Sequence, residues 1–235
     1  MNFIDIAILL ILAVLVLGGY YRGFLEALLG IGATIASFLL ALISVPFAAA
    51  SIKGHEKLYN MMLYYTEGSE YVAKTDVELT RTPIANVSAD TIKTVIQNAE
   101  MPKPMGGCVE RNIATEAFKA DGVTTLGDYF NQTIVSVVIN LLVLLAVFIV
   151  LRILCAFLIR GACYGRGGFP VLQHADGPIG AGVGLIGGVL LLFVLFMAVP
   201  ICLVILPKLY DFLSESFFGE FFYKANLLLS LVPAT

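Results

Sequence analysis

The sequence predicts an all-α polytopic membrane protein with about four transmembrane helices, a helical extramembrane insert and an interfacial amphipathic helix near the C-terminal end. Of its 235 residues, 59% are hydrophobic and only 13% are charged, whereas soluble domains carry roughly 25% charged residues. The charges are also concentrated, because 19 of the 31 charged residues lie between Ser51 and Asp128. The rest of the chain therefore consists of long apolar runs suited to a bilayer.

The first apolar run covers residues 6–52 and contains two ionisable residues, Arg22 and Glu26. As one straight helix it would be roughly 70 Å long, more than twice the thickness of a bilayer core of about 30 Å. Glycines, tyrosines and an arginine at residues 18–23 favour a turn at the membrane surface. We therefore expect a helical hairpin within residues 1–50, with helices at about 4–20 and 24–48. One long bent helix is the alternative.

Residues 51–128 form a polar segment that we expect to fold outside the membrane as a helical insert. Ser88 stands before a helical run and is a candidate N-cap, since a serine side chain can accept a hydrogen bond from the first helical turn. Further helices are expected near 56–66 and 108–120, separated by proline- and glycine-rich loops.

Residues 129–207 predict transmembrane helices 3 and 4. The segments 129–151 and 177–206 contain no charged residue, and each is long enough to span a bilayer. Pro178 fits a helix start, and Pro200 predicts a kink near the far end. Between the helices lies a glycine-rich segment with His174 and Asp176, which we interpret as a solvated loop rather than a proton relay. We expect three arginines to act as membrane-interface anchors: Arg152, Arg160 and Arg166.

The C-terminal segment, residues 208–235, predicts an amphipathic helix lying in the membrane interface. Charged side chains share one helical face, and apolar ones share another. The polar face consists of Lys208, Asp211 and Glu215, and the apolar face of Leu209, Leu213 and Phe217. Gly219 is expected to break this pattern.

Small residues at every fourth position form the clearest motif. Gly180, Gly184 and Gly188 share one face of the predicted fourth helix, and Gly19, Gly23 and Ala27 repeat the spacing more weakly. This spacing lets helix backbones approach closely. It favours helix packing within a subunit or an oligomer over a glycine-lined pathway.

Arg22 and Glu26 are one helical turn apart and form a candidate functional polar pair. Anchoring at the interface is the simpler interpretation. A pair facing a cavity is the alternative, because charge inside a membrane segment is energetically costly.

The composition argues against several other functions. The net charge of −3 gives no basic surface for nucleic acid. With two histidines, His55 and His174, and no metal-ligand, nucleophile-elbow or phosphate-loop motif, we expect no enzyme activity, no metal site and no cofactor. The four cysteines show no paired spacing and are interpreted as small hydrophobic residues.

Three features together resemble the CvpA family, the colicin V production proteins of bacterial inner membranes. They are Asp5 near the start, the motif Arg22-Gly23-Phe24 with Glu26 close behind, and the glycine-spaced fourth helix followed by an aromatic tail. The resemblance covers the membrane segments and omits much of the insert. It implies a location in the bacterial inner membrane and a link to toxin production, export or envelope maintenance, with no established reaction.

The chain departs from the family pattern at two positions. Asp176 stands ahead of Gly177 where family members often carry arginine, and Gly187 stands where they often carry arginine or lysine. A role for a second basic residue in the family therefore does not transfer to these positions.

Two functional hypotheses follow. The first is a non-enzymatic inner-membrane protein of CvpA type that supports toxin production, secretion or envelope homeostasis through helix-mediated assembly. Its partners would be membrane lipid and either further copies of the chain or other membrane proteins. The alternative is a small transporter or channel subunit with a pathway along the glycine-rich faces near Arg22 and Glu26.

Loop charges indicate that both termini and the insert face the extracytoplasmic side. Single cysteines introduced near Lys57, Arg166 and Thr235 into a cysteine-free chain test this orientation with a membrane-impermeant thiol reagent. We expect the sites near Lys57 and Thr235 to be labelled from outside and the site near Arg166 from the cytoplasmic side. Labelling near Lys57 only from inside would reverse the predicted topology.

Overall fold

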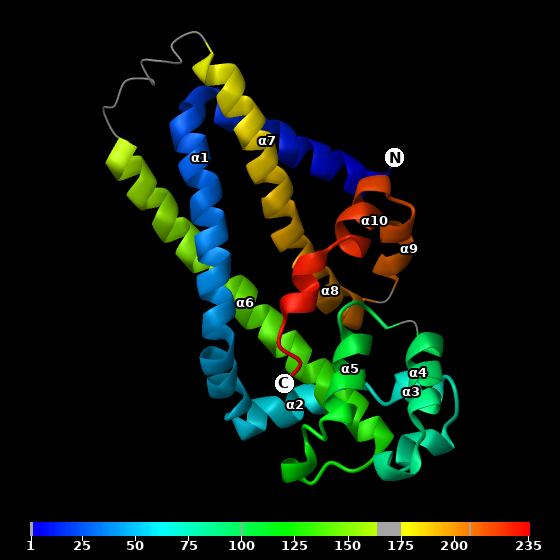
Figure 1. The fold of residues 1–235 in the computed structure, drawn as a ribbon. Helices are drawn as coiled ribbons and strands as arrows, with labels where there is room; N and C mark the ends of the chain where they lie inside the picture. Colours follow the sequence, from blue (N-terminus) through cyan, green and yellow to red (C-terminus); the bar gives the residue numbers. More distant parts are fainter. Residues whose placement is uncertain (1, 100, 164–174, 207) are drawn as a thin grey trace. The chain divides into compact units, whose positions relative to one another are not determined.

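The computed structural model describes residues 2–99, 101–163, 175–206 and 208–235. Among these described residues, 83% are helical and none lies in a β-strand. Among them, three helices are long and apolar enough to cross a membrane: Phe3–Lys53, Leu126–Cys163 and Asp176–Ile205. The predicted all-α membrane class is therefore confirmed (Figure 1). The predicted number of four spans stays a prediction.

The chain divides into two compact units, and its long helices contribute to both. The first unit comprises Met1–Ser44, Leu144–Val199 and Leu206–Leu228. The second comprises Val45–Val143, Pro200–Ile205 and Leu229–Thr235. Most of the apolar helix length thus belongs to the first unit, and the predicted polar insert belongs to the second.

Helix α1 (Phe3–Lys53) is helical on both sides of a single break at Gly23. Gly23 has φ 79° and ψ 175°, a backbone conformation that residues with a side chain rarely adopt. The bend is visible in the blue part of Figure 1. The turn predicted over residues 18–23 is thus confined to one residue, because one positive-φ glycine suffices to break the helix while its neighbours keep helical geometry.

Helix α6 (Leu126–Cys163) begins before the predicted span at 129 and continues past both Arg152 and Arg160. Helix α7 (Asp176–Leu195) is followed by a 3₁₀ turn at Phe196–Ala198 and by α8 (Val199–Ile205). The helical run is thus interrupted just before Pro200, whose ring nitrogen cannot donate the hydrogen bond that an unbroken α-helix requires at this point.

The C-terminal segment forms two short helices, α9 (Leu209–Ser214) and α10 (Phe217–Lys224), followed by a 3₁₀ turn at Leu227–Leu231. The prediction of a single helix that breaks at Gly219 is therefore wrong. The break falls at Glu215–Ser216, and Gly219 lies inside α10. The physical reason is that Ser216 caps α10, with its hydroxyl accepting a hydrogen bond from the Gly219 amide at 2.9 Å.

The second unit contains the insert, which is built from short helices. Ser88 caps α4, as predicted, by accepting a hydrogen bond from the Thr91 amide at 3.1 Å. The helix expected near 56–66 is observed, but the one expected at 108–120 begins and ends earlier, as α5. The α-helices of the insert are α2 (Glu56–Thr66), α3 (Glu70–Ala73), α4 (Ala89–Asn98) and α5 (Met105–Ala114). Its 3₁₀ turns are Glu78–Arg81, Ile84–Asn86 and Lys119–Asp121.

The core of the second unit joins the insert to the start of α6. Tyr129 and Phe130 of α6 are fully buried against apolar side chains of α3, α4 and α5, among them Val72, Val95 and Val109. The insert therefore does not rely on its own residues alone for a core. Burial also raises the pKa of the Cys108 thiol in α5, which keeps this thiol protonated and unreactive near neutral pH.

Buried polar side chains attach the last residues of the chain to this core. The Asn140 amide of α6 donates hydrogen bonds to the Pro233 and Thr235 carbonyl groups at 2.9 and 3.1 Å. The Asn112 amide of α5 donates to the Ala234 carbonyl group at 3.0 Å. Because both asparagines are buried, these hydrogen bonds fix the position of residues 233–235 within the second unit.

Candidate functional site

The bend in α1 is held by a carboxylate from α7. An Asp176 oxygen accepts a hydrogen bond from the Phe24 amide at 2.9 Å. Phe24 is the first residue of the second half of α1, so Asp176 caps the start of this helical half from another part of the chain. A Cβ placed on Gly23 would collide with the same carboxylate. Glycine is therefore required at position 23 both for its positive φ and for the close approach of Asp176.

On the N-terminal side of the bend, the first half of α1 packs against α7 through glycines on both helices. A Cβ placed on Gly19 would lie 3.0 Å from the Gly184 Cα and would collide with the Gly180 carbonyl oxygen. A Cβ on Gly184 would lie 2.7 Å from the Leu15 carbonyl oxygen. Side chains at these positions would push the two backbones apart. This glycine contact is made within one chain.

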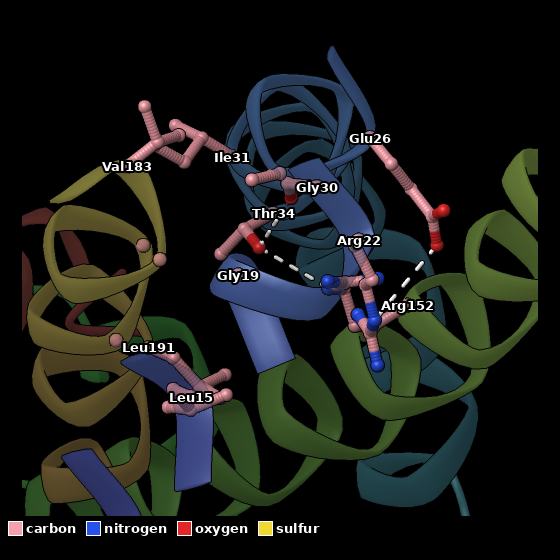
Figure 2. A pocket seen from close by; sticks show the side chains of 14 residues that line it. Leu15, Gly19, Arg22, Glu26, Gly30, Ile31, Thr34, Arg152, Val183 and Leu191 are labelled. Atoms are coloured by element: carbon pink, nitrogen blue, oxygen red, sulfur yellow. Dashed lines mark hydrogen bonds and ion pairs between the residues drawn. The ribbon is translucent and has the colours of Figure 1, made fainter. Parts of the chain in front are cut away.

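A small polar cavity borders this contact in the first unit (Figure 2). Its volume is about 70 Å³. The cavity is bounded by both halves of α1 together with α6 and α7. Its charged and polar lining residues are Arg22, Glu26, Thr34 and Arg152, and its glycines are Gly19, Gly30, Gly184, Gly187 and Gly188.

The charged side chains of the cavity come from helices that are distant in the sequence. Arg22 Nε lies 3.8 Å from a Glu26 carboxylate oxygen. Arg152 Nε donates a hydrogen bond to the Thr34 hydroxyl at 3.1 Å, and that hydroxyl donates in turn to the Gly30 carbonyl at 2.9 Å. Arg22 and Arg152 line the same cavity, and their guanidinium groups overlap in the view of Figure 2. The site therefore brings two cations and one carboxylate together among apolar helices.

Most of the residues selected from the sequence meet at this place. Gly19, Gly23, Gly180 and Gly184 lie at the glycine contact, and Gly188 extends it toward Leu12 and Leu15. Ala27 lines the cavity together with Arg22 and Glu26. Arg160 is exposed on α6, whereas Arg166 and His174 lie outside the described residues.

Sequence reasoning missed two residues of the site. Arg152 was assigned to the membrane interface, but its side chain reaches the cavity and binds Thr34. Asp176 was placed in a solvated loop, but it binds the α1 bend. Spacing alone cannot indicate a hydrogen bond across 152 residues.

A second carboxylate, that of the buried Asp5, joins the two ends of the first unit. Asp5, in the first turn of α1, accepts hydrogen bonds from the Ser216 hydroxyl at 2.7 Å and the Phe218 amide at 2.9 Å. Both donors lie at the N-terminus of α10, where a negative charge is stabilised by the orphan amides and the helix dipole. Asp5 thus attaches the aromatic tail to the start of the chain.

These features define a helical membrane protein in whose first unit Arg22, Glu26, Arg152 and Asp176 lie at a helix bend and the cavity beside it. Residues 4–69 match the family model described as Colicin V production protein. The chain is therefore similar to this family over these residues, and the predicted resemblance to CvpA proteins is confirmed there. The match contains Asp5, the Gly23 bend, Arg22 and Glu26. Comparisons with curated proteins and with solved structures give no match.

The glycine contact predicts opposite effects for two substitutions in one helix. Gly184→Ala should lower stability by about 1–3 kcal/mol, because the new methyl group overlaps the backbone of α1. Gly182→Ala is the matched control, since a Cβ placed on Gly182 would meet no atom within 4 Å. It should be neutral or stabilising by roughly 0.5–1 kcal/mol, because alanine favours helix. Thermal unfolding of the purified variants in detergent measures both, and equal Tm values would contradict the close contact.

Proposed function

We propose that the protein is a non-enzymatic inner-membrane protein of the colicin V production type. In this role it supports toxin production or secretion, or envelope homeostasis, by assembling with other membrane proteins or with further copies of itself. The family match over residues 4–69 supports the general role. The assembly mechanism is the part of the proposal that requires an experiment.

The assembly mechanism is supported by one observation: polar side chains in the apolar helices bind other helices of the same chain. Asp5 and Asp176 each bind a helix N-terminus, and Arg152 binds Thr34. These side chains hold helices together rather than leaving a row of free sites along a path. Gly19, Gly180 and Gly184 likewise face backbone atoms of the neighbouring helix, which favours packing over an open channel.

The size of the cavity also favours assembly over transport. Its volume of about 70 Å³ is room for only a few water molecules. The alternative, a small transporter or channel subunit near Arg22 and Glu26, is supported by the presence of ionisable side chains beside the glycine faces. Transport would require this cavity to enlarge and connect across the membrane.

The aromatic tail supplies a surface for assembly. Phe212 and Phe217 are 62% and 74% exposed, whereas Asp5 and the buried residues of α10 fix the helices that carry them. Rigidly held aromatic side chains are typical anchors of protein interfaces. In the proposed orientation, the insert and the tail both present their surfaces on the extracytoplasmic side.

A complementation experiment tests this function. The chain is expressed in a colicin V-producing strain that lacks its own member of the family, and released toxin activity is measured. Wild-type protein should restore release. The double variant Phe212→Ser/Phe217→Ser should weaken assembly at least about tenfold, because interface aromatics commonly contribute 2 kcal/mol or more. Toxin release should therefore fall while the membrane level of the protein stays constant.

Glu215→Gln is the matched control, since this residue is exposed on the same segment and carries no aromatic surface. It should complement like the wild type. Full release from the double aromatic variant, with loss of release from Arg22→Gln, would favour the transporter. A wild-type chain that fails to restore release although it is present in the membrane would contradict the toxin-production role.

A further inference from the structure

The cavity contains more positive than negative charge. Its lining includes two guanidinium groups, Arg22 and Arg152, and one carboxylate, Glu26. Glu26 is paired with Arg22 at 3.8 Å, whereas the partner of Arg152 Nε is the neutral Thr34 hydroxyl. Asp176 does not line the cavity, and its carboxylate binds the Phe24 amide. Among the described residues, the lining therefore carries one excess positive charge.

An unbalanced cation is costly where apolar helices surround it. Arg152 is half-buried on α6, a helix that is long and apolar enough to cross a membrane. Arginines in such segments face cavities and pair with other groups, because an unpaired charge in hydrocarbon raises the free energy of the folded state. An anion in the cavity would balance the charge and occupy the remaining donors of both guanidinium groups.

The geometry suits a single oxyanion group. A guanidinium offers several N–H donors in a planar fork that matches phosphate or carboxylate oxygens. The Thr34 hydroxyl positions the Arg152 guanidinium group by accepting its hydrogen bond. The same hydroxyl is oriented by its own hydrogen bond to the Gly30 carbonyl. Gly30 places no side chain against Arg152, since a Cβ at this position would lie 3.9 Å from an Arg152 guanidinium nitrogen. The volume of about 70 Å³ is large enough for one tetrahedral group beside the two arginines.

The position of Arg22 indicates the source of this group. Arg22 directly precedes the break at Gly23, where the first apolar run bends. Ends of apolar helical runs lie near the headgroup region, where lipid phosphates are abundant and arginines bind them. We propose that Arg22 and Arg152 form a binding site for a phosphate group, supplied by the headgroup of an anionic phospholipid. This site goes beyond the proposed function and does not depend on it.

Ligand binding to the purified protein in a zwitterionic detergent tests the site. Three probes are compared by thermal unfolding and native mass spectrometry: dioctanoyl phosphatidylglycerol, dioctanoyl phosphatidylcholine, and sodium phosphate against sodium chloride at equal ionic strength. Phosphatidylglycerol should bind and raise Tm, with phosphatidylcholine at least about tenfold weaker. Arg22→Gln and Arg152→Gln should each weaken phosphatidylglycerol binding by about tenfold or more, because each removes charged hydrogen bonds to phosphate.

Arg160→Gln is the matched control, because it removes the same charge from an exposed position on the same helix. It should bind phosphatidylglycerol like the wild type. Arg152→Lys tests the fork geometry, since it keeps the charge but loses the bidentate contact, and its affinity should lie between those of wild type and Arg152→Gln. Ligand-free Arg152→Gln should be no less stable than wild type, because the excess charge is gone.

The outcomes distinguish a lipid headgroup from free phosphate as the ligand, and they also show whether the proposed binding site exists. Stabilisation by sodium phosphate that equals stabilisation by phosphatidylglycerol would assign the site to free phosphate. A requirement for phosphatidylglycerol would assign it to the lipid. Equal binding of both lipids with no response to phosphate, or an equal loss in Arg160→Gln, would overturn the site. Neither result bears on toxin release, which is measured separately in cells.

Discussion

The bend at Gly23, held by the Asp176 carboxylate, is the constraint on which the first unit depends. The bend requires a residue without a side chain, and it exposes the amides that begin the second half of α1. Asp176 satisfies one of them at 2.9 Å. An N-terminal cap of this kind contributes about 0.5–2 kcal/mol. Asp176 also joins the start of α7 to α1, so one carboxylate stabilises a helix and positions its neighbour.

The glycine contact and the cavity follow from this joint. Once α7 begins beside Gly23, Gly180 and Gly184 come to lie along the first half of α1, where a larger side chain would overlap backbone atoms. The second half of α1 then presents Glu26, Gly30 and Thr34 to the same cavity as Arg22. Asp5 closes the opposite end of the first half by binding α10. Two carboxylates, Asp5 and Asp176, thus bind at the two ends of the first half of α1 and position α10 and α7 against it.

The sequence predicted those features of the molecule that depend on local pattern. Apolar runs predicted the membrane class, Ser88 predicted the start of α4, and the Arg22-Gly23-Phe24 motif predicted the family. Features that depend on contacts between distant residues were missed. The partners of Asp176 and Arg152 lie 152 and 118 residues away, and no spacing rule connects them. The tail was mispredicted for a local reason, because the Ser216 cap determines where α10 begins.

A distance across the bend tests the central claim most directly. Spin labels at Leu10 and Leu40, both more than half exposed, are placed in a cysteine-free chain in lipid nanodiscs and measured by double electron–electron resonance. In a continuous helix, 30 residues at about 1.5 Å each would separate the sites by about 45 Å. A bend at Gly23 predicts a single distribution centred well below that value. A distribution centred near 45 Å would show that the first apolar run is straight and would contradict the account.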